Sequence, residues 1–282
     1  MTRNSRFSYY YHLYSIDVLL GVLSGSAMAV KVVGVNPGFA WWIILPITVW
    51  WIYIADHLVD GFRLKEKTQN PRHLFFYQHR KKLIVMLCIV SILDLILIKF
   101  YLPFRMILFG GIIGALVLIY LVAVHFSKTN RYIIFPKELF VAFLYTIGIW
   151  GGPIILTNDL HKNVLPILVF FMVTLSNLFI YSFFERDQDV KDGQITLLVA
   201  YGEKRALKII YGWIMFSILF TLIVSIASRL DSVIFFSMMI FLVMLIAQAY
   251  LLHMASWFAI NNRFRWLNEG IFLMPLAILF CF

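Results

Sequence analysis

The side chains with the clearest capacity for chemistry form two acidic clusters, each at the end of an apolar stretch about as long as a membrane span. The first contains Asp56 and Asp60, and the second contains Glu185 and Asp189, with Asp192 just beyond. Within each pair the carboxylates are four residues apart, so they share one face of a helix. Carboxylates crowded beside a bilayer are costly unless a cation lies between them. A hard divalent cation such as Mg²⁺, holding a phosphorylated substrate, would meet that need.

The composition predicts the setting in which these clusters lie. The chain has 282 residues, of which 62% are hydrophobic and only 13% are charged. Long apolar runs separated by short polar loops are typical of a polytopic α-helical membrane protein and unlike a membrane barrel. With no linker in view, residues 1–282 are expected to form one transmembrane domain. The two cysteines, Cys88 and Cys281, do not suggest a disulfide framework.

Nine runs have the length and composition of membrane spans. They lie near residues 16–35, 39–56, 83–101, 105–126, 136–157, 163–184, 206–228, 232–256 and 266–282. The basic residues are divided very unevenly between the two sides that these spans define. Of the 24 lysines and arginines, one side holds only Lys31, Lys99, Arg105, Lys162 and Arg229.

This asymmetry predicts a cytoplasmic N-terminus, with both acidic clusters on the cytoplasmic side, as in the inner membrane of a bacterium. It also accounts for the net charge of +10 without a nucleic-acid partner.

Each cluster also has a simpler interpretation. Asp56 and Asp60 could lie at a solvated helix end and pair with Arg63 or with loop lysines. The charges of the second cluster could likewise pair with one another. Two similar clusters on one side of a bundle favour a shared site instead, and Asn177 and Tyr181 continue the second acidic face inward by one turn each. His57, His73 and His79 show no metal-ligand spacing, and polar surface is expected for them.

Beyond the second carboxylate pair, the spacing extends to Gly193, Thr196 and Leu197. This pattern resembles the second aspartate-rich motif of the UbiA superfamily of intramembrane prenyltransferases, D-x-x-x-D-x-x-x-G-x-x-T-L, with Glu185 in place of the first aspartate. That family has nine helices, and its two acidic motifs follow helices 2 and 6.

The first family motif is N-D-x-x-D-x-x-x-D, and here Asp56 and Asp60 match its last two aspartates. Ile52 and Tyr53 stand where the family has Asn and Asp, so the full motif is absent. The family also has a diphosphate-contacting lysine near the position of Lys137.

The resemblance implies Mg²⁺-dependent transfer of a prenyl group from an isoprenoid diphosphate to a lipophilic, aromatic acceptor. The metal ligands would be Asp56, Asp60, Glu185, Asp189 and Asp192. Lys137 would bind the leaving diphosphate, with help from Arg63 and Arg186, and Tyr181 and Asn177 would complete the substrate site.

An allylic cation would need an aromatic lining, which Trp50, Tyr53, Tyr181 and Phe184 could supply, although such rings more often serve packing. Three other interpretations stay open: a UbiA-type terpene cyclase, a non-catalytic family member and a membrane transporter. A transporter could use Asp94, which lies inside a predicted span, as an ion site. The acidic clusters lie at span ends rather than at the bilayer midplane, which favours the enzyme.

Overall fold

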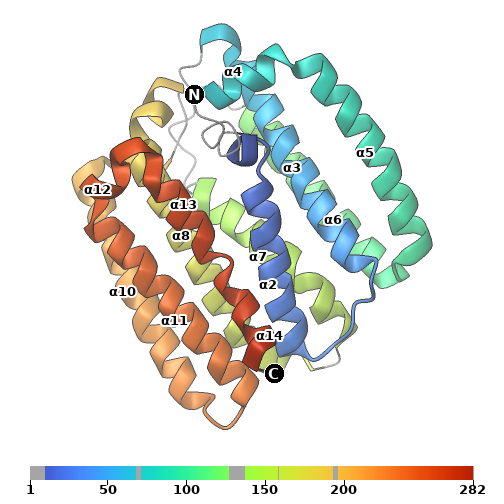
Figure 1. The fold of residues 1–282 in the computed structure, drawn as a ribbon, viewed down its shortest axis with the longest axis vertical. Coiled ribbons are helices and arrows are strands. Elements are labelled where there is room, and N and C mark those ends of the chain that lie inside the picture. The colour runs from blue at the N-terminus through green and yellow to red at the C-terminus, as the bar shows by residue number, and fades with distance from the viewer. Residues whose placement is uncertain (1–9, 68–70, 127–136, 158, 193–195, 282) are drawn as a thin grey trace. The chain divides into compact units, whose positions relative to one another are not determined.

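The computed structural model describes residues 10–67, 71–126, 137–157, 159–192 and 196–281, and within these ranges the chain contains helices and no strand (Figure 1). Nine helical segments of this part are long and apolar enough to cross a membrane, as the sequence predicts. Helices form because a backbone in lipid must satisfy its hydrogen bonds internally.

Eight of these segments are built on long helices: α2 (Ile16–Val33), α3 (Trp41–Leu64), α5 (Arg80–Tyr101), α6 (Phe104–Phe126), α7 (Lys137–Leu156), α8 (Val164–Asp192), α10 (Glu203–Ala227) and α11 (Ser232–His253). The ninth consists of α12 (Ala255–Ala259), η3 (Ile260–Asn262), α13 (Arg263–Ile271), η4 (Met274–Ala277) and α14 (Ile278–Cys281). Short elements in the connections are η1 (Lys65–Lys67), α4 (Pro71–Gln78), η2 (His161–Asn163) and α9 (Leu197–Tyr201).

The chain divides into two compact units, and the boundary falls inside α2. The first unit contains the described residues of 1–23 and 37–130. In it, α3 packs against α4, α5 and α6. One buried hydrophobic cluster of this unit contains Leu13, Ile54, Leu58, Phe76, Leu83 and Leu87. The outward faces of α5 and α6 are rich in exposed apolar side chains, which suits contact with lipid chains.

The approach of α4 to α3 depends on Gly61. A Cβ atom at this position would lie 3.1 Å from the carbonyl oxygen of His73 and 3.1 Å from the amide nitrogen of Tyr77. Both neighbours are backbone atoms of α4, so a side chain could be accommodated only by moving the helix. Glycine therefore allows α4 to bring its polar side chains against the acidic end of α3.

The second unit contains the described residues of 24–36 and 131–282. Here α8 packs against α7, α10 and α11, and α10 and α11 lie side by side (Figure 1). With 29 residues, α8 is roughly 43 Å long at 1.5 Å per residue. A bilayer core is about 30 Å thick, so the acidic end of α8 extends beyond the apolar stretch that crosses it.

The last membrane segment is broken twice. Asn261 and Asn262 adopt positive φ angles of 54° and 55° between α12 and α13. Asparagine tolerates this left-handed conformation better than most residues, and it ends one helix and starts another. A second break separates α13 from η4 and α14. Consequently, α13 is a separate helix of nine residues that begins with Arg263.

Candidate functional site

The first acidic cluster occupies the last turns of α3. Asp60 is buried, and its carboxylate lies 3.6 Å from Nη2 of Arg63 and 3.8 Å from Nε2 of His73 on α4. Asp56 is partly exposed one turn earlier on the same helix. The cluster thus combines two carboxylates with an arginine and an imidazole.

The environment of His73 differs from the sequence expectation. Polar surface was predicted for this histidine, yet its side chain is buried, and its ring centroid lies 6.1 Å from that of His57. The reason is the close packing of α4 on Gly61, which carries the imidazole to the Asp60 carboxylate. His79 is exposed, as expected, and stacks on Phe75.

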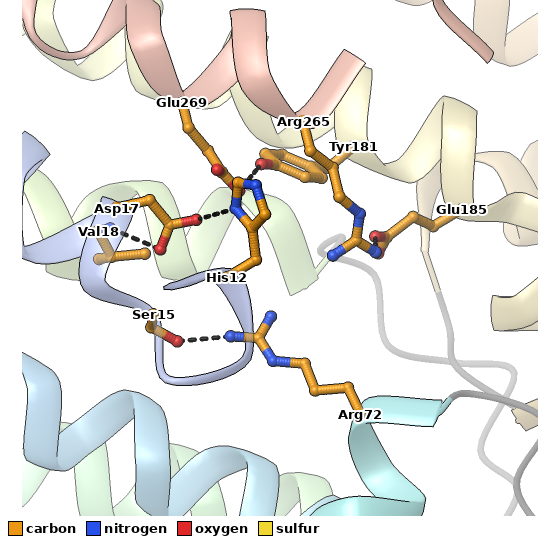
Figure 2. Close-up of polar contacts among 9 residues, drawn as sticks. All are labelled: His12, Ser15, Asp17, Val18, Arg72, Tyr181, Glu185, Arg265 and Glu269. Carbon is orange, nitrogen blue, oxygen red and sulfur yellow. Dashed lines mark hydrogen bonds and ion pairs between the residues drawn. The ribbon is translucent and has the colours of Figure 1, made fainter. Parts of the chain in front are cut away.

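The second acidic cluster lies at the end of α8, and its first carboxylate is paired with an arginine. Arg265 on α13 forms an ion pair with Glu185 through Nη2 and Oε1 (Figure 2). The two side chains are 22% and 27% exposed, so the pair is accessible from outside and is not sealed in the core.

The second carboxylate of the Glu185–Asp189 pair has charged neighbours on α7. Asp189 is close enough to Lys137, at the start of α7, to interact with it electrostatically, and it also interacts with Thr196 and Glu138. Asp192 ends α8 and is buried. Each carboxylate of the predicted Glu185–Asp189 pair therefore has a cation nearby, on a different helix.

Glu138, next to Lys137, ties α7 to the segment that follows the acidic cluster. Its buried carboxylate accepts a hydrogen bond of 2.8 Å from the backbone N–H of Leu197. Leu197 is the first residue of α9, and Thr196 precedes it in an extended conformation. The Thr-Leu part of the sequence motif thus marks the start of a helix held by α7. The motif glycine, Gly193, lies outside the described residues, as does the segment 132–136 before Lys137.

A polar contact continues inward between α8 and α13. The hydroxyl of Tyr181 donates a hydrogen bond of 2.7 Å to Glu269, as Figure 2 shows. The side-chain nitrogen of Asn268 lies 3.4 Å from the backbone oxygen of Asn177 and donates a hydrogen bond to it. The predicted acidic face of α8 is therefore a mixed polar face, and α13 covers it.

Arg186, a predicted substrate-binding residue, points to a different part of the unit. Its guanidinium pairs with Glu203 of α10 at 2.7 Å, and both side chains are well exposed. Arg186 follows Glu185 directly, and successive residues of a helix point about 100° apart. This explains why the two neighbours contact different helices.

Three of the other candidates take part in packing. The indole N–H of Trp50 donates a hydrogen bond of 2.9 Å to the backbone oxygen of Tyr14. The ring of Phe184 stacks on that of Phe264, with centroids 4.3 Å apart and planes 5° from parallel. Asp94 is buried and accepts a hydrogen bond of 2.8 Å from Thr48, which links α5 to α3.

Carboxylate oxygens are the ligands that Mg²⁺ prefers, and the donors at both clusters fit that ion chemically. Asp56 and Asp60 offer two carboxylates on one helical face, and Asp189 with Asp192 offers two more within one turn. Glu185 fits less simply, because its carboxylate already neutralises an arginine. The first cluster belongs to one compact unit and the second to the other, so their convergence on a shared ion stays a prediction.

Sequence reasoning missed the contributions of Arg265, Glu269 and Glu138. Glu269 lies inside the last predicted span and Arg265 lies just before it, and a charge inside a span is a candidate for a functional role. That signal was present but lacked a partner in the sequence. Glu138 lies at the start of a predicted span, but its hydrogen-bond partner is 59 positions away in the chain, so the sequence did not indicate its role.

Comparison with known proteins supports the architecture. No family model matches the chain, and no curated protein matches it in sequence. A solved structure of a digeranylgeranylglyceryl phosphate synthase is similar in structure, with a TM-score of 0.56 and 14% sequence identity, over 98% of both chains. At this identity the likeness shows the fold alone. The protein is a multi-pass membrane protein that shares the UbiA-type helical fold, as predicted from the sequence motifs.

Proposed function

We propose that the protein transfers a prenyl group from an isoprenoid diphosphate to a lipophilic, aromatic acceptor in a Mg²⁺-dependent reaction. The observation that carries this proposal is the composition of the α8 end, where the carboxylates of Glu185 and Asp189 each lie near a cation at the end of an apolar helix. A prenyl diphosphate has a long apolar tail and a highly charged head, so its site must combine these two environments. The similarity in fold to a digeranylgeranylglyceryl phosphate synthase adds support.

The residues proposed to hold Mg²⁺ are Asp56 and Asp60 from α3, and Asp189 and Asp192 from α8. When bound, the ion would supply positive charge to the diphosphate and so favour cleavage of the allylic C–O bond. Lys137 is proposed to donate charge-assisted hydrogen bonds to the departing diphosphate. Arg63 beside Asp60 is the corresponding cation of the first cluster.

The transferred group would leave as an allylic cation while the C–O bonding electrons stay with the diphosphate. The acceptor would then form the new bond to the allylic carbon and lose a proton to a basic group. Near the second cluster, the aromatic ring of Tyr181 would face this cation. By the asymmetry of the basic residues, we place the N-terminus and both clusters on the cytoplasmic side of the membrane.

The test is incubation of the purified protein with labelled prenyl diphosphates and Mg²⁺, with diphosphate release measured in the presence and absence of aromatic acceptors. Release that depends on the acceptor is the expected result. Release without acceptor, accompanied by a cyclic product, would instead make the protein a cyclase. A lack of diphosphate release with every prenyl diphosphate tested would overturn the proposal. Asp60→Ala and Asp189→Ala should each abolish turnover while the protein still folds, and full activity would remove that residue from the site.

A further inference from the structure

The short helix α13 begins with two arginines that have different surroundings. The guanidinium of Arg263 lies 4.4 Å from the ring centroid of Trp257, a cation–π contact. Arg265 forms the ion pair with Glu185 at the end of α8 (Figure 2). Residues two apart on a helix point about 200° apart, so one arginine faces the acidic cluster and the other faces away from it.

The position of Arg265 is set by several contacts between α13 and α8. The Tyr181–Glu269 hydrogen bond, the Asn268–Asn177 hydrogen bond and the Phe264–Phe184 stack lie on the same face of α13 as this arginine or beside it. Side chains locked in this way lose little entropy when they bind a ligand. Arg265 is therefore a preorganised cation at the α8 end.

The guanidinium of Arg265 also has the chemistry that a phosphate group requires. It presents N–H donors in a planar fork that can pair with two oxygens at once. The side chain is also 22% exposed, which leaves it within reach of a ligand. One helical turn beyond Glu185, Asp189 interacts with Lys137. Two cations, each beside a carboxylate, thus lie along the end of α8.

We propose that Arg265 binds the diphosphate head of the substrate, and that Glu185 is a positioning residue that holds the guanidinium in place. This inference rests on the proposed function and deepens it. At the second acidic cluster, the diphosphate would be held both by a metal ion and by an arginine. A guanidinium matches two phosphate oxygens through its fork, whereas a single ammonium acts as a point charge. The glutamate at position 185, a departure from the family aspartate, has the longer side chain and contacts an arginine on a neighbouring helix.

The test compares KM and kcat of four variants with those of the wild type, with farnesyl diphosphate, Mg²⁺ and a saturating aromatic acceptor. Arg265→Gln should raise KM about 10- to 100-fold, the range expected for a charge-assisted hydrogen bond. Inhibition by inorganic diphosphate should weaken by a similar factor. Arg265→Lys should raise KM about 3- to 10-fold, because it keeps the charge and loses the fork. Glu185→Gln, whose amide oxygen still accepts from the guanidinium, should give a similar rise.

Arg263→Gln is the matched control, since it removes the same charge two residues away on the same helix. Its KM should stay within about twofold of the wild type, because Arg263 contacts Trp257 and not the acidic cluster, and a charge effect from that side of the helix is screened. An unchanged KM in Arg265→Gln, or an equal rise in Arg263→Gln, would overturn the inference. If Arg265→Gln does not fold, the inference is tested with Arg265→Lys, and an unchanged KM in that variant would overturn it. A wild-type protein that is silent with farnesyl diphosphate and its longer homologues refutes the proposed function itself.

Discussion

The hydrogen bond between Glu138 and the start of α9 can be tested independently of any catalytic assay. We predict that Glu138→Ala releases the N-terminus of α9 while the rest of the bundle stays folded. The carboxylate accepts from the backbone N–H of Leu197 at 2.8 Å, and both residues are buried. A hydrogen bond to a charged group contributes about 1.5–3 kcal/mol, and a buried N–H left without a partner is costly.

These values set the expected size of the effect. A loss of about 2 kcal/mol in local stability corresponds to a roughly 30-fold increase in the opening of this segment. Hydrogen–deuterium exchange of the peptide that contains Leu197, measured in nanodiscs, reports that opening directly. Glu138→Gln retains an acceptor oxygen, so exchange should accelerate by only about threefold.

The control is Glu203→Gln in the same unit. This glutamate pairs with Arg186 at the exposed surface, where an ion pair contributes about 0–1 kcal/mol. Exchange at Leu197 should therefore match the wild type in Glu203→Gln. Wild-type exchange in Glu138→Ala would refute the reasoning, because it would mean that the hydrogen bond does not hold α9 in place.

Substitutions at three further positions test contacts between the helices. Gly61→Ala should lower the free energy of unfolding by about 1–3 kcal/mol and the melting temperature by several degrees, because the new methyl group would press on the backbone of α4 near His73. A melting temperature equal to that of the wild type would contradict the close approach of α3 and α4. Asp94→Leu should destabilise the protein more than Asp94→Asn, since asparagine can still accept the hydrogen bond from Thr48, which contributes about 1 kcal/mol; equal melting temperatures would show that this hydrogen bond contributes nothing. Arg186→Ala should lower the free energy of unfolding by less than about 1 kcal/mol, because its ion pair is exposed. A larger loss would contradict this.

The sequence predicted those features of the fold that depend on local composition. All nine spans are present among the described residues, because twenty apolar residues in lipid have few alternatives to a helix. The carboxylates of both clusters also lie at the helix ends where the hydropathy pattern placed them, on α3 and α8. What depends on side-chain periodicity and span length was therefore predictable.

The partners of those carboxylates were not predictable in the same way. Glu185 and Arg265 are 80 positions apart, and nothing in either segment specifies the other. The metal-ligand role predicted for Glu185 rested on its charge and spacing, and it stays a prediction. His73 was misjudged for a related reason, since its burial follows from the absence of a side chain at Gly61. Such contacts follow from tertiary packing, which a single sequence does not encode in any short pattern.

The joints in the final membrane segment have a consequence for how the protein responds to its bilayer. A continuous helix that is too long or too short for a membrane tilts or shifts as a rigid rod. Here α14 and η4 are separate from α13, and the N–H of Leu276 is hydrogen-bonded to Ser24 of α2 at 3.1 Å. Adjustment to lipid thickness can take place at the breaks, without sliding α13 along α8. The ion pair between Arg265 and Glu185 can thereby keep its geometry when the thickness of the surrounding lipid changes.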